Sequence, residues 1–124
     1  MNLLEVFSET EDLVSLPSHS ILFEEGANAD FMYVIMKGGI SLSLHGTVVG
    51  TAHQGDVIGE MALLGSEPRS ATATTVTDCV LAPIDVHSFK LLIQHTPEFA
   101  LHVMNLLADR LRFANERLSR LSPT

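Results

Sequence analysis

A chain of 124 residues with 46% hydrophobic and 18% charged residues has the size and composition of one ordinary folded domain. Its formal net charge of -8, with only seven Lys and Arg, argues against nucleic acid as a partner, because a polyphosphate backbone is bound through many cationic contacts. No apolar run has the length of a signal peptide core or a membrane span, so we expect a cytoplasmic protein without membrane contact.

Short strand patterns separated by glycine-rich turns follow a short helical segment around residues 3–7. The expected strands are residues 21–24, 31–36, 40–44, 47–52, 72–76 and 79–84. We expect a turn at residues 25–28 and a hairpin through Gly38 and Gly39 that joins the second strand to the third. Roughly seven short strands with tight turns favour an antiparallel sandwich or barrel over about residues 13–85. The single cysteine, Cys79, is then a small buried side chain rather than a nucleophile.

Two helices are expected after the strands, over about residues 86–121, and the whole chain, residues 1–124, is expected to form one domain. Asp85 is a suitable N-cap for a helix to about Gln94, and Thr96 followed by Pro97 begins a second helix to about residue 121. Apolar residues recur along this second helix at alternating spacings of three and four: Met104, Leu107, Leu111, Ala114, Leu118 and Leu121. Such a stripe either packs on the strands of its own chain or forms the seam of a homodimer, and its length favours the dimer.

Residues 59–71 combine one acid, several small residues and one isolated cation. Arg69 is the only Lys or Arg between Gly38 and Phe89. Residues 59–64 are expected to form a single helical turn, whose free N–H groups favour an anion. Arg69 could hold the same anion and Ser70 could add a hydroxyl, while Glu60 suits sugar hydroxyls. A ribose phosphate would satisfy both ends; alternatively, Glu60 and Arg69 pair with each other and pin the loop.

The order Gly-Glu, apolar residue, Ala-Leu and then Pro-Arg-Ser-Ala, with eight residues between Glu60 and Arg69, resembles the phosphate-binding cassette of cyclic nucleotide-binding domains. It looks closest to the bacterial catabolite activator branch. The resemblance implies a mainly β fold, an antiparallel β-roll or jelly-roll barrel with a short phosphate-binding helix and two C-terminal helices. It also implies cAMP as the ligand, with cGMP as the alternative, because Ser70 matches the bacterial cAMP binders while threonine there is associated with cGMP in eukaryotic relatives.

The resemblance also assigns residue roles. Glu60 would take the ribose 2′-hydroxyl, and Arg69 with Ser70 would hold the cyclic phosphate. The remaining pocket residues implied by the family are Ile58, Gly59 and Ala71 in the wall, the backbone N–H groups around Met61 and Ala62 in the phosphate cradle, and Asn115 against the purine. Asn115 could equally be an exposed helix residue. Ile58 and Met61 stand where many members have an aromatic residue and leucine, and both keep the wall apolar.

Catabolite activators continue into a DNA-binding helix-turn-helix, which this sequence does not contain after residue 121. We therefore expect the output to come from another protein, from a rearrangement of the dimer, or from part of a longer protein. A barrel that dimerises without binding nucleotide is the alternative function. A metal-dependent, cupin-like enzyme is a third hypothesis, but the six histidines lack the paired spacing of a metal site, and no nucleophile has an adjacent base.

Overall fold

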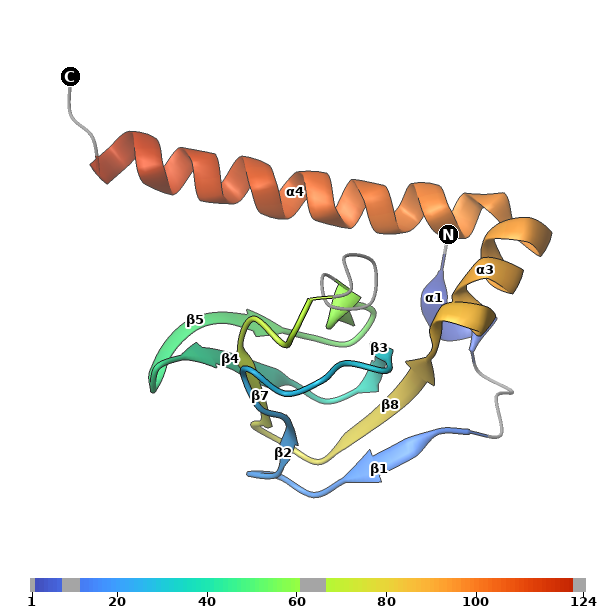
Figure 1. Cartoon of the computed structure of the whole chain (residues 1–124), viewed down its shortest axis with the longest axis horizontal. Coiled ribbons are helices and arrows are strands. Elements are labelled where there is room, and N and C mark those ends of the chain that lie inside the picture. Colours follow the sequence, from blue (N-terminus) through green and yellow to red (C-terminus); the bar gives the residue numbers. More distant parts are fainter. Residues whose placement is uncertain (1, 8–11, 61–66, 122–124) are drawn as a thin grey trace. The chain divides into compact units, whose positions relative to one another are not determined.

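The computed structural model describes residues 2–7, 12–60 and 67–121, which belong to two compact units, Asn2–Lys90 and the segment from Leu91 onward. The first unit contains α1 (Leu3–Val6), β1 (Val14–Leu16), β2 (Ile21–Phe23), β3 (Met32–Lys37), β4 (Ile40–Leu44), β5 (Thr47–Ala52), β6 (Val57–Ile58), β7 (Thr72–Thr75) and β8 (Cys79–Ile84) (Figure 1). Helix α3 (Val86–His95) begins in the first unit, and α4 (Pro97–Leu121) lies in the second.

The strands form two antiparallel sheets, in the orders β1-β8-β3-β6 and β2-β7-β4-β5. This arrangement confirms the expected mainly β, antiparallel jelly-roll fold. No strand pairing in the described part of the chain joins one sheet to the other, so the sheets are not closed into the expected barrel. The structure is therefore better described as two packed sheets with open edges.

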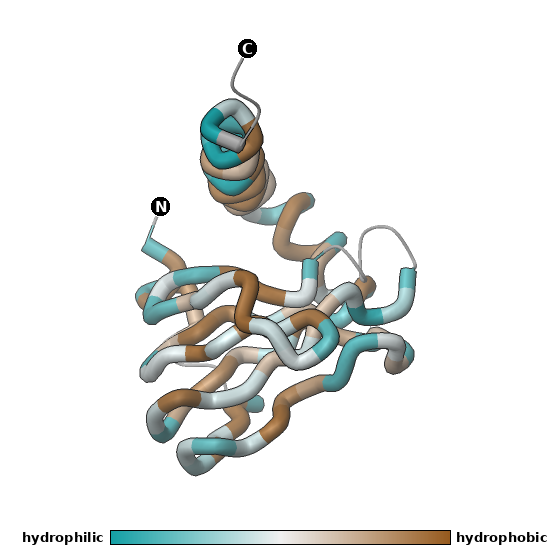
Figure 2. The backbone as a smooth tube through the Cα atoms, turned by 90° about the vertical axis from the view of Figure 1, so that its left-hand side faces the viewer, coloured by the Kyte–Doolittle hydropathy of each residue, from teal (hydrophilic) through white to brown (hydrophobic). Residues whose placement is uncertain are grey.

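Apolar side chains from both sheets meet in one core. Its buried members are Ile35, Ile40, Ala52, Ile58, Ala73, Cys79 and Leu81. Figure 2 shows hydrophobic and hydrophilic residues interspersed along the strands, as the period-two pattern of a half-buried sheet requires. The prediction that Cys79 is buried is confirmed, since its side chain is only 2% exposed.

The expected hairpin at Gly38 and Gly39 is wrong. Strand β3 pairs with β6 and β8, whereas β4 pairs with β5 and β7, so the chain crosses from one sheet to the other at this point. Gly38 has φ +94°, and a Cβ there would overlap the carbonyl oxygen of Asp78 and lie 2.7 Å from Cys79 Sγ. The missing side chain of Gly38 thus allows the backbone to approach the loop before β8 closely. The two glycines do not form a two-residue turn between paired strands.

Most other predicted elements are confirmed to within one residue at each end. The sequence reading missed β1 and β6, which have three and two residues and are too short to display a period. The predicted cap of α3 is confirmed, because the Ser88 N–H donates to Asp85 Oδ1 at 2.7 Å. This hydrogen bond is the main cause that lowers the pKa of the Asp85 carboxyl below its ordinary value.

Thr75 connects β7 to the loop between β1 and β2. Its hydroxyl donates to the Pro17 carbonyl at 2.7 Å and accepts from the Ser20 N–H at 2.8 Å, and its side chain is 1% exposed. We predict that Thr75→Val lowers the free energy of unfolding by about 1–3 kcal/mol, because two part-buried hydrogen bonds to the backbone are lost. Urea unfolding measures the change, and the exposed Thr47→Val is the control, expected within about 0.5 kcal/mol of the parent. Equal loss in both variants would contradict this role of Thr75.

Candidate functional site

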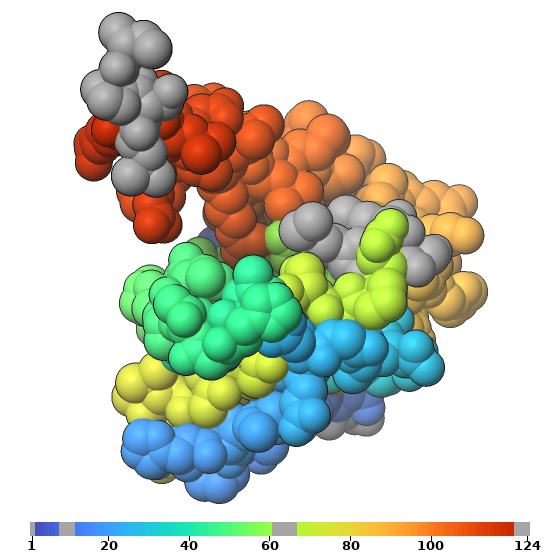
Figure 3. Space-filling model, turned by 60° about the vertical axis from the view of Figure 1, so that its left-hand side comes forward, coloured from blue at the N-terminus to red at the C-terminus, as the bar shows by residue number. Residues whose placement is uncertain are grey.

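The loop before β7 is tied to the turn after β2 by two backbone hydrogen bonds. The Arg69 N–H donates to the Ala27 carbonyl at 2.9 Å, and the Gly26 N–H donates to the Arg69 carbonyl at 2.8 Å. Figure 3 shows the segment around residues 67–70, in yellow-green, lying against the light-blue segment around residue 30. These two hydrogen bonds fix the backbone of Arg69 at both its N–H and its carbonyl, independently of its side-chain contacts.

The Arg69 side chain turns inward and is held by two backbone carbonyls. Nη2 donates to the Phe31 carbonyl at 2.6 Å, and Nη1 donates to the Gly59 carbonyl at 3.2 Å. Only 5% of the residue is exposed. The guanidinium carbon lies 4.1 Å from the centre of the Phe23 ring and 5.9 Å from that of Tyr33. The guanidinium is thus fixed at its edge by carbonyls and on one face by an aromatic ring.

The buried Arg69 guanidinium has no paired carboxylate among the described residues. In the part of the chain that the structure describes, no ion pair joins Arg69 to a carboxylate, and Arg69 Nε is buried without a hydrogen-bond acceptor. Loss of solvent is the main cause that lowers the pKa of the Arg69 guanidinium, which nevertheless stays charged near neutral pH. A buried positive charge with an unused donor is suited to an anion that approaches from outside the chain.

Glu60 directly follows the Gly59 carbonyl that holds Arg69. It follows Gly59, whose carbonyl accepts from Arg69, and it is 6% exposed. Glu60 and Arg69 are the two charged side chains that are buried among the described residues, and no ion pair joins them to each other. The alternative in which the two residues pin the loop by pairing is therefore not observed. The described residues thus include one buried acidic and one buried basic side chain next to Gly59.

Gly59 is required by the position of Arg69. Its φ is +78°, and a Cβ built there would overlap Arg69 Nη1 and lie 3.5 Å from a Phe23 ring carbon. Strand β6 ends one residue earlier at Ile58, which is paired with Tyr33 of β3. Only glycine allows the chain to leave β6 in this conformation with the guanidinium so close to its backbone.

A family model described as "Cyclic nucleotide-binding domain" matches residues 13–96, which is more than half of the chain. The chain belongs to the cyclic nucleotide-binding domain family. It is 30% identical over 125 residues to the cAMP-activated global transcriptional regulator CRP of Salmonella typhimurium, and the match covers 96% of this chain and 60% of that protein.

Two solved structures have the same fold. The catabolite activator protein of Thermus thermophilus superposes with a TM-score of 0.78 at 29% identity, over 89% of this chain and 54% of that one. The c-di-GMP responsive global regulator CLP of Xanthomonas campestris gives a TM-score of 0.80 at 26% identity, over 95% of this chain and 62% of that one. This cyclic nucleotide-binding domain therefore spans between 54% and 62% of the length of each of these relatives.

The structure brings several of the residues expected in the cassette to one place. Gly59, Glu60 and Arg69 lie together, with the buried Ile58 directly before them. Ser70 and Ala71 follow Arg69, and Ser70 is exposed. Met61 and Ala62, and most of the predicted helical turn at residues 59–64, lie outside the described residues. Asn115 lies on α4 in the second unit with its side chain exposed, and its contact with a purine stays a prediction.

The sequence analysis did not predict the aromatic cluster beside Arg69. Phe23, Phe31 and Tyr33 are three of the seven aromatic residues in the chain, and all three fall between residues 23 and 33. The Tyr33 ring centre lies 6.3 Å from each of the two Phe ring centres. Their clustering in the sequence was a usable signal, but the contact with Arg69 spans more than thirty residues and has no local pattern.

The described residues offer little support for a metal site, a membrane-spanning helix or a catalytic cysteine. No three or more His, Cys, Asp or Glu side chains there are grouped as metal ligands, and no helix there is long and apolar enough to cross a membrane. The Cys79 thiol donates to the carbonyls of Gly39 and Thr77 at 3.3 Å each, and burial raises its pKa. A buried thiol of raised pKa is a poor nucleophile.

Proposed function

We propose that this chain is a regulatory module, not an enzyme, that binds cAMP at the loop formed by Gly59, Glu60 and Arg69. The observation that carries the proposal is the state of Arg69, which is buried, has no ion pair to a carboxylate among the described residues and has an unused Nε donor. A cyclic phosphate supplies one negative charge and several acceptor oxygens. The residues present therefore fit such a ligand.

The proposed roles follow from the two ends of the site. Arg69 and the exposed hydroxyl of Ser70 would bind the cyclic phosphate, since both are donors and they are adjacent in the chain. Glu60, on the far side of Gly59, would accept a hydrogen bond from the ribose 2′-hydroxyl. Separating the carboxylate from the phosphate by the ribose avoids repulsion between the two negative groups.

The choice of cAMP has two supports. Ser70 is the residue type that the resemblance associates with cAMP, and the Salmonella relative is described as cAMP-activated. The fold alone does not select the nucleotide, because the Xanthomonas relative is described as responsive to c-di-GMP. A threonine in place of Ser70 would favour cGMP under the same reasoning.

Isothermal titration of the purified chain with cAMP, cGMP, c-di-GMP and linear 5′-AMP tests the proposal. The protein is first checked by absorbance to be free of co-purified nucleotide. We expect one cAMP per chain, bound more tightly than the other three compounds. Tighter binding of cGMP or c-di-GMP would correct the ligand, whereas folded protein that gives no heat with any of the four would support the non-binding scaffold instead.

We also propose that two copies associate through α4 and that ligand occupancy is signalled along this helix, as a shift between two states. Three large apolar side chains at spacings of seven, Met104, Leu111 and Leu118, are 56%, 62% and 62% exposed. A row of exposed apolar residues on a helix is suited to a matching helix of a second copy. The downstream partner that would receive the signal is a separate, unidentified protein or part of a longer chain.

We predict that Leu111→Glu converts a dimer into a monomer, because it places a charge in the centre of the apolar seam. Analytical ultracentrifugation measures the mass. Ser119→Glu is the matched control, since it adds the same charge at an exposed position of α4 beside the seam. If both variants keep the mass of the parent dimer, the stripe is not the seam.

A further inference from the structure

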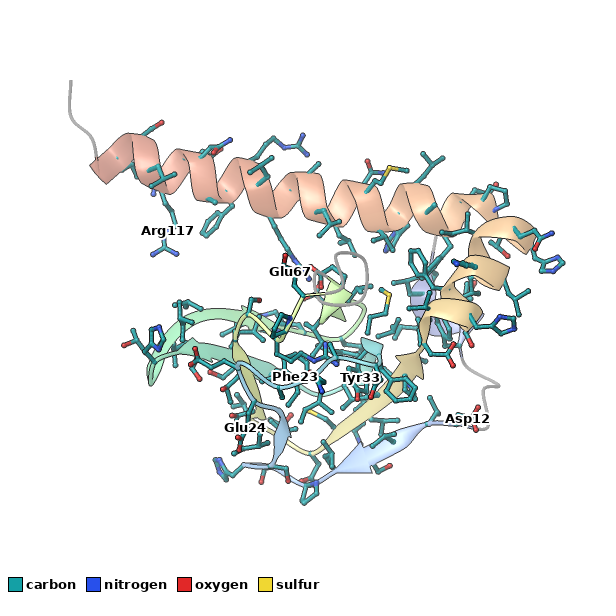
Figure 4. All side chains as sticks on the ribbon, in the orientation of Figure 1. Asp12, Phe23, Glu24, Tyr33, Glu67 and Arg117 are labelled. Carbon is teal, nitrogen blue, oxygen red and sulfur yellow. The ribbon has the colours of Figure 1, made fainter. Side chains whose placement is uncertain are left out.

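The guanidinium of Arg69 lies over the ring of Phe23. The guanidinium carbon is 4.1 Å from the centre of the Phe23 ring, whereas the distance to the Tyr33 ring is 5.9 Å. The two rings are stacked, with centres 6.3 Å apart and an interplanar angle of 24°, and Figure 4 shows them side by side. Phe23 is therefore the closest aromatic contact of the cation, and Tyr33 lies beside both Phe23 and the cation.

An aromatic ring can stabilise the Arg69 cation without the drawbacks of a carboxylate partner. Arg69 is 5% exposed, so its charge requires compensation within the protein. A carboxylate would compensate it but would occupy its N–H groups and repel an incoming phosphate. The negative face of a ring attracts the cation without accepting its in-plane hydrogen bonds. Phe23 thus stabilises the charge without accepting a hydrogen bond from Nε, which is buried without an acceptor in the structure.

The ring and the two carbonyls together restrict the guanidinium in complementary directions. The carbonyls of Phe31 and Gly59 accept from Nη2 and Nη1 and so fix the group within its own plane. The Phe23 ring blocks movement out of that plane, and it extends far enough to lie 3.5 Å from a Cβ built on Gly59. With these contacts in place, the guanidinium is held in one orientation before any ligand binds.

We propose that Phe23 is a positioning residue of the anion site, whose ring orients Arg69 so that Nε and the remaining N–H groups meet the ligand phosphate. This inference rests on the proposed function and adds a residue outside the predicted cassette. Its contribution is made through Arg69 and requires no contact between Phe23 and the nucleotide.

The test compares three variants of the full chain by titration with cAMP. Phe23→Leu removes the ring but keeps a half-buried apolar side chain, and we expect about 5- to 30-fold weaker binding, from the size of a desolvated cation–π contact. Phe23→Tyr retains the ring face and should bind within about twofold of the parent. Phe113→Leu is the matched control, because its ring lies against Arg117 on α4 and not against Arg69.

The titration is accompanied by an NMR measurement of Arg69, which a change in packing alone would not alter. The Arg69 Nε–H signal in the ligand-free protein should shift downfield in Phe23→Leu, where the ring current is lost, and stay near its parent position in Phe113→Leu. Equal binding by Phe23→Leu and the parent would overturn the positioning role while leaving the proposed function intact. Equal weakening in Phe23→Leu and Phe23→Tyr would also overturn it. If the parent itself binds no cyclic nucleotide, the proposed function fails and the positioning role fails with it.

Discussion

Replacing Arg69 with alanine is expected to reduce the affinity for cyclic nucleotide by about 2–5 kcal/mol, or roughly 30-fold to several thousandfold. The loss is large because Arg69 is the one cation buried among the described residues, and its contact with the phosphate would be made away from water. Titration calorimetry measures the change against the parent protein.

Two further variants separate the charge of Arg69 from its geometry. Arg69→Lys keeps the positive charge but lacks the planar fork that reaches both backbone carbonyls, so we expect an intermediate affinity. Arg112→Ala removes an exposed arginine that pairs with Asp109 on α4 and should leave the affinity unchanged. Binding by Arg69→Ala that matched the parent would remove the phosphate role from Arg69.

The second large effect is expected for Gly59→Ala. The left-handed backbone at this position would lower the free energy of unfolding by about 1–2 kcal/mol in the variant. In addition, the new Cβ would overlap Arg69 Nη1 and push the guanidinium away from the Gly59 carbonyl. We therefore expect the affinity for cyclic nucleotide to fall at least about tenfold, which is about 1.4 kcal/mol.

Gly46 provides a matched control for this substitution. Its φ of +82° is close to the +78° of Gly59, but a Cβ there would meet nothing within 4 Å. Gly46→Ala should therefore show a similar loss of stability in urea unfolding with no loss of affinity. If the two alanine variants bind cyclic nucleotide equally well, the position of Arg69 against Gly59 is not needed for binding.

Local patterns accounted for much of this structure. Strands appeared where β-branched and apolar residues alternate, as in β4 and β7, and α4 begins at Pro97 as its sequence signal predicts. The roles that the motif assigns to Glu60 and Arg69 stay predictions, because residues 61–66 between them lie outside the described residues.

The sequence was less informative where tertiary contacts decide the outcome. Gly38 and Gly39 resemble a hairpin turn, but the close approach of Asp78 makes them a crossover between sheets. The partners of Arg69 also come from distant parts of the chain, since Phe23 and Phe31 precede it by about forty residues. The sequence also allowed Arg69 to pair with Glu60. In the structure, Arg69 donates to the Gly59 carbonyl instead.

The most direct test of the account follows the Nε–H group of Arg69 by NMR during a titration with cAMP. The Arg69→Lys spectrum identifies the signal, because only that correlation disappears. We predict that cAMP shifts it downfield, with saturation at one nucleotide per chain and the same dissociation constant as calorimetry gives, since a phosphate oxygen would become the acceptor that Nε lacks. If cAMP binds by calorimetry while the Arg69 signal stays at its ligand-free position, the phosphate is held elsewhere and the central claim is contradicted.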